Sequence, residues 1–137
     1  MNESQKPNKM NLWIGGYGGN SYSLKYDGKN LLYSVSESEE SSITYRIEAT
    51  ENDWDIFMQA LDAVDIWNWE SEYCNPFICD GTQWKVCIVW GRRSSHVIGN
   101  NCYPDSFAQA SENPEPTEIF LSYLSAVKRL VGGQHFE

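Results

Sequence analysis

The sequence predicts an α+β fold, in which an antiparallel sheet of about five strands carries two amphipathic helices on one face in the order β-β-β-α-β-β-α. Three observations predict it. Apolar residues alternate with polar ones in several short segments, as is typical of half-buried strands. Tight-turn sequences join neighbouring segments, so the strands are expected to pair antiparallel. Two longer segments repeat apolar residues at helical spacing, and each can cover part of one sheet face.

The first half of the chain reads as a three-stranded meander. Residues 21–26 and 31–35 alternate and flank Asp27-Gly28-Lys29-Asn30, which is hairpin-turn chemistry because Gly and Asn tolerate positive φ. Residues 43–49 alternate in the same way and form the third strand. Leu12–Ile14 can start a strand ahead of this meander.

Both helices carry end signals. The first is expected from about Glu51 to Val64, with Thr50 as its cap and Asp53 in the capping-box position. The last element has Pro116 in its first turn and an apolar stripe along one side. Gly132-Gly133 ends it.

Length and charge limit the classes of function. One domain is expected over residues 11–137, with residues 1–10 as a disordered lead. The net charge of −9 would repel phosphate backbones and anionic membranes, so neither a nucleic acid nor a membrane is an expected partner. The chain shows no membrane-length apolar run and no signal-peptide stretch near Met1, so a cytoplasmic location with reduced cysteines is expected.

The aromatic-rich stretch from Trp67 to Tyr103 holds the candidate site. Residues 67–80 lead into an expected strand at 83–90, and residues 100–103 leave its hairpin partner at 95–99, so both segments emerge at one sheet end. A concavity with aromatic walls and a few polar groups is the usual form of a ligand site. We expect six side chains to surround it: Trp67, Trp69, Tyr73, Asp80, Asn101 and Tyr103.

Each of these residues also has a purely structural interpretation. The aromatic side chains can pack the helix onto the sheet, and Trp84, which alternates with Val86 and Ile88, is expected to lie in the core. Asp80 and Asn101 can instead cap their own turns, as Asp and Asn often do.

The sequence patterns for metal binding, for a cysteine nucleophile and for phosphate binding are weaker. Cys74, Cys79, Cys87, His96 and Cys102 offer metal ligands, but the spacing lacks the paired CxxC motifs of a zinc ribbon, so no metal or cofactor is expected. A cysteine–histidine nucleophile can be drawn with His96 or His135, the only histidines, yet neither has the context of a known nucleophile family. The glycine-rich bend at residues 15–20 lacks the Lys-Ser/Thr of a P-loop. No catalytic residue is predicted, and an enzyme is the least favoured class.

One combination of motifs resembles a known pattern. It consists of Trp67-x-Trp69, Tyr73, Asp80-Gly81-Thr82-Gln83-Trp84, Gly99-Asn100-Asn101 and Tyr103-Pro104. Together they resemble uncharacterised bacterial proteins, of the kind encoded by integron mobile gene cassettes, and the resemblance covers residues 11–130. It implies an early glycine-rich hairpin and a helix before the aromatic segment, and no catalytic residue. Cys102 departs from the small residue expected there.

Two functions are therefore predicted. The first is a small soluble binding domain that takes a small polar or cationic ligand in the aromatic pocket. The alternative is a protein-interaction or immunity-like module whose acidic surface faces a basic partner. A homodimer is also expected, because strands bearing Tyr22, Tyr26, Tyr33 and Tyr45 can place apolar surface on the uncovered sheet face.

Overall fold

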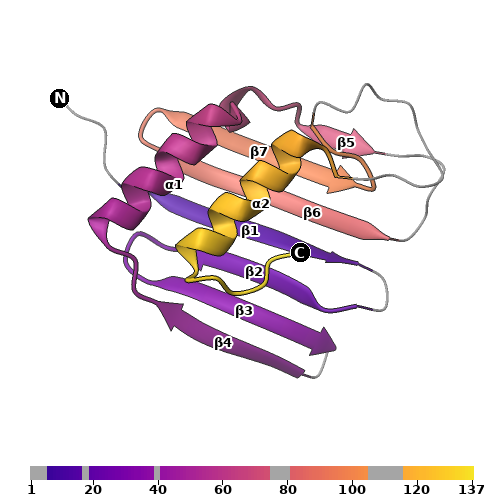
Figure 1. Cartoon of the computed structure of the whole chain (residues 1–137), viewed down its shortest axis with the longest axis horizontal. Coiled ribbons are helices and arrows are strands. Elements are labelled where there is room, and N and C mark those ends of the chain that lie inside the picture. Colours follow the sequence, from indigo (N-terminus) through magenta and orange to yellow (C-terminus); the bar gives the residue numbers. More distant parts are fainter. Residues whose placement is uncertain (1–5, 17–18, 39–40, 75–80, 105–115) are drawn as a thin grey trace.

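The computed structural model describes residues 6–16, 19–38, 41–74, 81–104 and 116–137, and the statements below concern these residues. They form one seven-stranded sheet in the order β4-β3-β2-β1-β6-β7-β5, and both α-helices lie on the same side of it (Figure 1). The α+β class and the two helices on one face are confirmed, while the sheet has more strands than the five expected. No helix in this part of the chain is long and apolar enough to cross a membrane.

The elements follow the expected order with two additions, β1 and β5. Their bounds are β1 (Lys9–Gly16), β2 (Ser21–Tyr26), β3 (Leu31–Ser38), β4 (Ser41–Ile47), α1 (Glu51–Ala63), the 3-10 helix η1 (Ile66–Asn68), β5 (Glu72–Cys74), β6 (Thr82–Trp90), β7 (Arg93–Asn100) and α2 (Glu118–Leu130). All neighbouring strands pair antiparallel except β5 and β7, which are parallel.

β1 is the central strand and joins the two hairpin systems. It pairs with β2 on one side and with β6 on the other. The strand begins at Lys9 rather than Leu12, inside the segment expected to be a disordered lead. Asn8 is also held, because its N–H donates to the Val89 carbonyl at 2.8 Å and its Oδ1 accepts from the Gly91 N–H at 2.7 Å.

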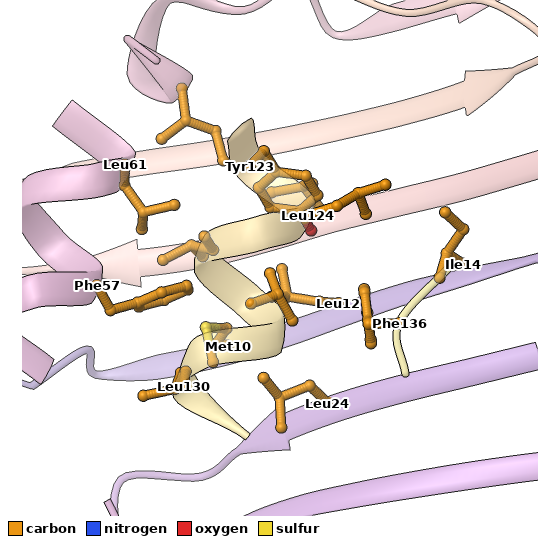
Figure 2. Close-up of a cluster of buried hydrophobic side chains, with 14 of the residues drawn as sticks. Met10, Leu12, Ile14, Leu24, Phe57, Leu61, Tyr123, Leu124, Leu130 and Phe136 are labelled. Atoms are coloured by element: carbon orange, nitrogen blue, oxygen red, sulfur yellow. The ribbon is translucent and has the colours of Figure 1, made fainter. Parts of the chain in front are cut away.

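The core lies between the sheet and the two helices. Met10, Leu12 and Ile14 alternate on β1 and face the helices, together with Leu24 of β2 (Figure 2). The helices bury one stripe each, which contains Trp54, Phe57 and Leu61 on α1 and Phe120, Tyr123, Leu124, Val127 and Leu130 on α2. Full burial of one such side chain contributes about 1.5–3 kcal/mol, so this layer carries most of the driving force for folding.

The predicted capping box at the start of α1 is confirmed. The Thr50 N–H donates to Asp53 Oδ2 at 2.9 Å, and the Asp53 N–H donates to Thr50 Oγ1 at 3.1 Å. The N–H donated by the Thr50 backbone lowers the pKa of the Asp53 carboxyl, and the Thr50 side chain adds to this effect. The Asp53 carboxylate therefore has a lower pKa in the folded chain than in the unfolded chain.

This pKa shift predicts part of the acid sensitivity of the fold. A carboxyl whose pKa is lower in the folded state stabilises the fold above its unfolded pKa, and that contribution is lost as the pH falls through the folded pKa. We expect Asp53→Asn to lose less stability than the wild type when urea unfolding is compared at about pH 6 and about pH 2.5. Asp55→Asn, an exposed position on the same helix, is the matched control and should follow the wild type. Equal losses for all three proteins would contradict the prediction.

The tyrosines expected on the uncovered sheet face lie on the other face. Tyr26 and Tyr33 are buried under the helices, and Tyr22 packs against the same core. Tyr45 pairs directly with Tyr33 and therefore shares its face. The tyrosine-based reason for an apolar open face is wrong, because the register places the intervening polar residues of these strands toward solvent.

Candidate functional site

Three of the predicted site residues pack into a core cluster around Trp84 of β6. Trp84 is 1% exposed, and its ring centroid lies 5.9 Å from Trp69, 5.9 Å from Tyr73 and 4.7 Å from Phe120. Tyr103 joins through Phe120, with 4.7 Å between the ring centroids. These rings wedge α2 against the end of the sheet, which is the alternative that the sequence left open.

The polar atoms of this cluster are used inside the protein. Trp69 Nε1 donates to the Val64 carbonyl at 2.9 Å, and the Tyr73 hydroxyl accepts from the Glu70 N–H at 3.0 Å. Burial raises the pKa of the Tyr103 phenol, although a hydrogen bond with the Thr82 side chain acts in the opposite direction. Burial also raises the pKa of Tyr123 on α2. Both phenols therefore stay protonated at neutral pH and cannot act as general bases.

Asn101 ties the end of β7 to the start of β6. Its side chain is 3% exposed, its φ is 54°, and its Oδ1 accepts from the Thr82 N–H at 3.0 Å. Its own N–H donates to the Thr82 carbonyl at 2.9 Å, and its Nδ2 donates to Asn100 Oδ1 at 2.8 Å. These bonds fit the turn-capping interpretation. Asp80, its expected companion, lies outside the described residues.

Trp67 makes a separate set of contacts beside the end of α1. Its Nε1 donates to Asp62 Oδ1 at 2.8 Å, and the guanidinium carbon of Arg93 lies 4.7 Å from the centroid of its ring. Arg93 also forms an ion pair with the same Asp62 oxygen at 2.7 Å. A stacked, paired arginine of this kind fixes the β6–β7 hairpin against α1.

A groove runs between α1 and α2 on the outer side of the helical layer. Its volume is about 580 Å³, and Ile56 and Leu121 provide apolar walls. Asp53, Glu118 and Arg129 line it as well. The groove therefore mixes both signs of charge.

The sheet face opposite the helices, called the open face below, carries two rows of side chains that run across the strands. The lysine row consists of Arg46, Leu32, Lys25, Asn11, Cys87 and His96, which are successive cross-strand partners from β4 to β7. The tryptophan row consists of Thr44, Ser34, Ser23, Trp13, Lys85, Ile98 and Glu72. On β1, β2, β3, β6 and β7 these positions alternate with buried ones, and their cross-strand partners on β4 and β5 share the same face, so both rows face solvent.

Charge on these two rows is opposite in sign to that of the chain. The whole protein carries −9. The two rows contain Arg46, Lys25 and Lys85, and their single acid, Glu72, lies at the far edge strand. Lys9 extends the positive charge along β1, because it alternates with buried Met10. Arg46 forms an exposed ion pair with Glu48 at 3.5 Å, so the net positive charge of this face comes mainly from Lys9, Lys25 and Lys85.

A cavity and a tryptophan side chain shape the surface of this face. A cavity of about 450 Å³ opens at the lysine row, where Lys9, Asn11, Lys25 and Cys87 contribute to its lining. Along the tryptophan row, the half-buried Trp13 indole lies against Gly15, where an added Cβ would come within 2.8 Å of the ring. The face thus offers an aromatic surface beside a positively charged depression.

The described thiols and imidazoles form one close pair. Cys87 Sγ lies 3.3 Å from His96 Nδ1, across the β6–β7 ladder. Cys74 is an exposed free thiol at the sheet edge. Among the residues that the structure describes, Cys, His, Asp and Glu do not gather into a group of three that could hold a metal ion. Cys79, one of the candidate ligands, lies outside those residues.

No protein-family model matches the chain, and no curated protein matches its sequence. The resemblance to cassette-encoded bacterial proteins therefore stays a prediction.

Proposed function

We propose that this chain is a protein-interaction module that docks an acidic protein partner on the open face of its sheet. The main support is that this face is positively charged, whereas the chain as a whole is negatively charged. Lys25, Lys85 and Arg46 occupy the two central rows of a protein whose net charge is −9. Local complementarity of this kind between a positive face and a partner's carboxylates fixes the orientation of docking.

The chemistry of the face narrows the class of partner. Leu32 in the lysine row is 37% exposed, and Ile98 in the tryptophan row is 56% exposed. Trp13, also in the tryptophan row, lies on β1, between the strands that carry these two residues. Apolar and aromatic side chains of this kind contribute binding energy when a partner removes them from water. A partner protein whose surface mixes carboxylates with apolar side chains would complement both the cations and the apolar side chains of this face. A polyphosphate strand fits less well, because it offers no apolar group to cover the exposed Leu32 and Ile98 side chains.

The two functions predicted from sequence have weaker support. The aromatic pocket would need free rings and free polar atoms, whereas Trp69, Tyr73 and Asn101 already pack and hydrogen-bond within the protein. The acidic surface exists on α1, where Glu51 and Asp55 are exposed. Such a solvated acidic helix is common in soluble proteins and points to no particular partner.

Isotope-labelled protein titrated with a short peptide of alternating glutamate and valine tests the docking proposal. We expect the Trp13 indole resonance and the Lys25 and Lys85 side-chain resonances to shift, and the shifts to weaken with added salt. A lysine–valine peptide is the opposite-charge control and should leave these resonances in place. Shifts at the α1–α2 groove with the lysine peptide alone, or stronger binding of a single-stranded oligonucleotide, would overturn the proposal.

We also propose that the chain self-associates, through the free edge of β4 rather than through tyrosines on the open face. Ile43 and Tyr45 on this edge strand are 56% and 48% exposed. An antiparallel two-fold pairing centred on Thr44 would set Ile43 opposite Tyr45 of the second copy. It would also set Arg46 opposite Ser42, which avoids two opposed cations. Aromatic and β-branched residues are favourable cross-strand neighbours.

Light scattering at about tens of micromolar chain tests this pairing, because the expected mass is that of a two-fold dimer. Ile43→Lys should give a monomer, since it places a charge in the pairing edge. Leu121→Lys changes another exposed apolar residue, which lies on α2, and should leave the dimer intact. A monomeric wild type, or a dimer in all three proteins, would reject the β4 interface.

A further inference from the structure

The open face carries a thiol–imidazole pair that the docking proposal does not use. Cys87 and His96 are direct cross-strand partners on β6 and β7, and 3.3 Å separates Cys87 Sγ from His96 Nδ1. Cys87 is half-buried and lines the cavity of about 450 Å³, so a small molecule in the cavity can reach its sulfur. His96 is exposed, and its ring can exchange protons with water.

The charges around this thiol are mostly positive. Lys85 lies two residues along β6 on the same face, and Lys9 lies diagonally across the β1–β6 ladder. Lys25 lines the cavity from β2. The acid in the lining is Asp27, whose Oδ1 already accepts the N–H groups of Lys29 and Asn30 at 2.9 Å and 2.8 Å. Cations near a thiol attract anionic reagents to it.

We propose that Cys87 is a site of thiol–disulfide exchange with small anionic disulfides, and that His96 is its proton acceptor. With the proton of the neutral imidazole on Nε2, the lone pair of Nδ1 takes the proton from Cys87 Sγ. The thiolate then attacks one sulfur of the disulfide, and the S–S bond of the reagent breaks. The leaving thiolate departs with the electron pair and takes the proton from His96. One disulfide is consumed, and one mixed disulfide and one thiol are formed.

The lysines give this site a preference for the charge of the reagent. Oxidised glutathione carries more carboxylates than amines, and its carboxylates can lie against Lys9 and Lys25 in the cavity and against Lys85 beside it. Cystamine presents amines instead and should be disfavoured at the same thiol. This inference goes beyond partner docking and does not depend on it, although an adduct on Cys87 would stand in the lysine row.

Mass-spectrometric mapping of the folded full chain after timed exposure to oxidised glutathione tests the proposal. Cys87 should be modified about tenfold faster than the exposed Cys74. The preference for Cys87 should shrink or vanish with cystamine. His96→Gln should slow modification of Cys87 about tenfold while leaving Cys74 unchanged.

A double variant separates the charge role of the lysines from the acid–base role of His96. Lys9→Gln with Lys85→Gln should lower the rate with oxidised glutathione more than the rate with cystamine. All these positions are exposed, so the fold is expected to tolerate the changes. The proposal is overturned if Cys87 reacts no faster than Cys74, or if His96→Gln leaves its rate unchanged.

Discussion

Trp84→Ala should destabilise the fold by about 3–5 kcal/mol, the usual effect of deleting a large buried aromatic side chain. Trp84 is 1% exposed, its ring contacts Trp69, Tyr73 and Phe120, and its Nε1 donates to the Cys102 carbonyl at 3.0 Å. The variant leaves a cavity where the sheet end, β5 and α2 meet. Urea unfolding followed by circular dichroism measures the loss.

Trp67→Ala is the matched control, because it removes the same side chain from a partly exposed position. Its loss should be smaller, about 1 kcal/mol, from the contacts with Arg93 and the hydrogen bond to Asp62. If the two variants lose equal stability, the cluster around Trp84 is not the core that the structure describes, and an open aromatic pocket regains support.

Asn101→Ala should cost about 2–4 kcal/mol. The residue sits at φ 54°, a conformation that alanine adopts with strain. Its loss also leaves the Thr82 N–H without the Oδ1 acceptor now 3.0 Å away. Asn101→Gly separates the two effects, because glycine accepts the backbone conformation but restores no hydrogen bond. The glycine variant should recover about 1–2 kcal/mol of the loss in the same unfolding experiment. Equal losses would show that backbone strain plays no part.

Local features of the chain predicted the elements well, and non-local pairing was predicted less well. The Thr50 capping box and the alternation from Trp84 to Trp90 are local signals, and the structure confirms both. The central place of β1 depends on pairing with β6, about 70 residues along the chain, which no local pattern encodes. β5 has three residues and pairs parallel, so it lacks both length and a hairpin turn as signals.

The positive charge of the open face becomes visible only once the pairing register of the strands is known. Lys25, Lys85 and Arg46 are scattered in sequence, and the net charge of −9 hides them. Cross-strand pairing places them on two adjacent rows with Trp13. The contact of Cys87 with His96 is likewise a product of the β6–β7 register, which pairs the two residues directly.

Paired charge reversals test whether the lysine and tryptophan rows bind an acidic partner because of their local charge. The affinity for the glutamate–valine peptide is compared between Lys25→Glu/Lys85→Glu and Arg92→Glu/Arg129→Glu. Both variants change the net charge equally, but Arg92 lies in the β6–β7 turn and Arg129 lies on α2, away from the open face. We predict a loss of about tenfold or more for the first variant and a small, salt-screened loss for the second. Equal losses in the two variants would contradict a docking site on the open face.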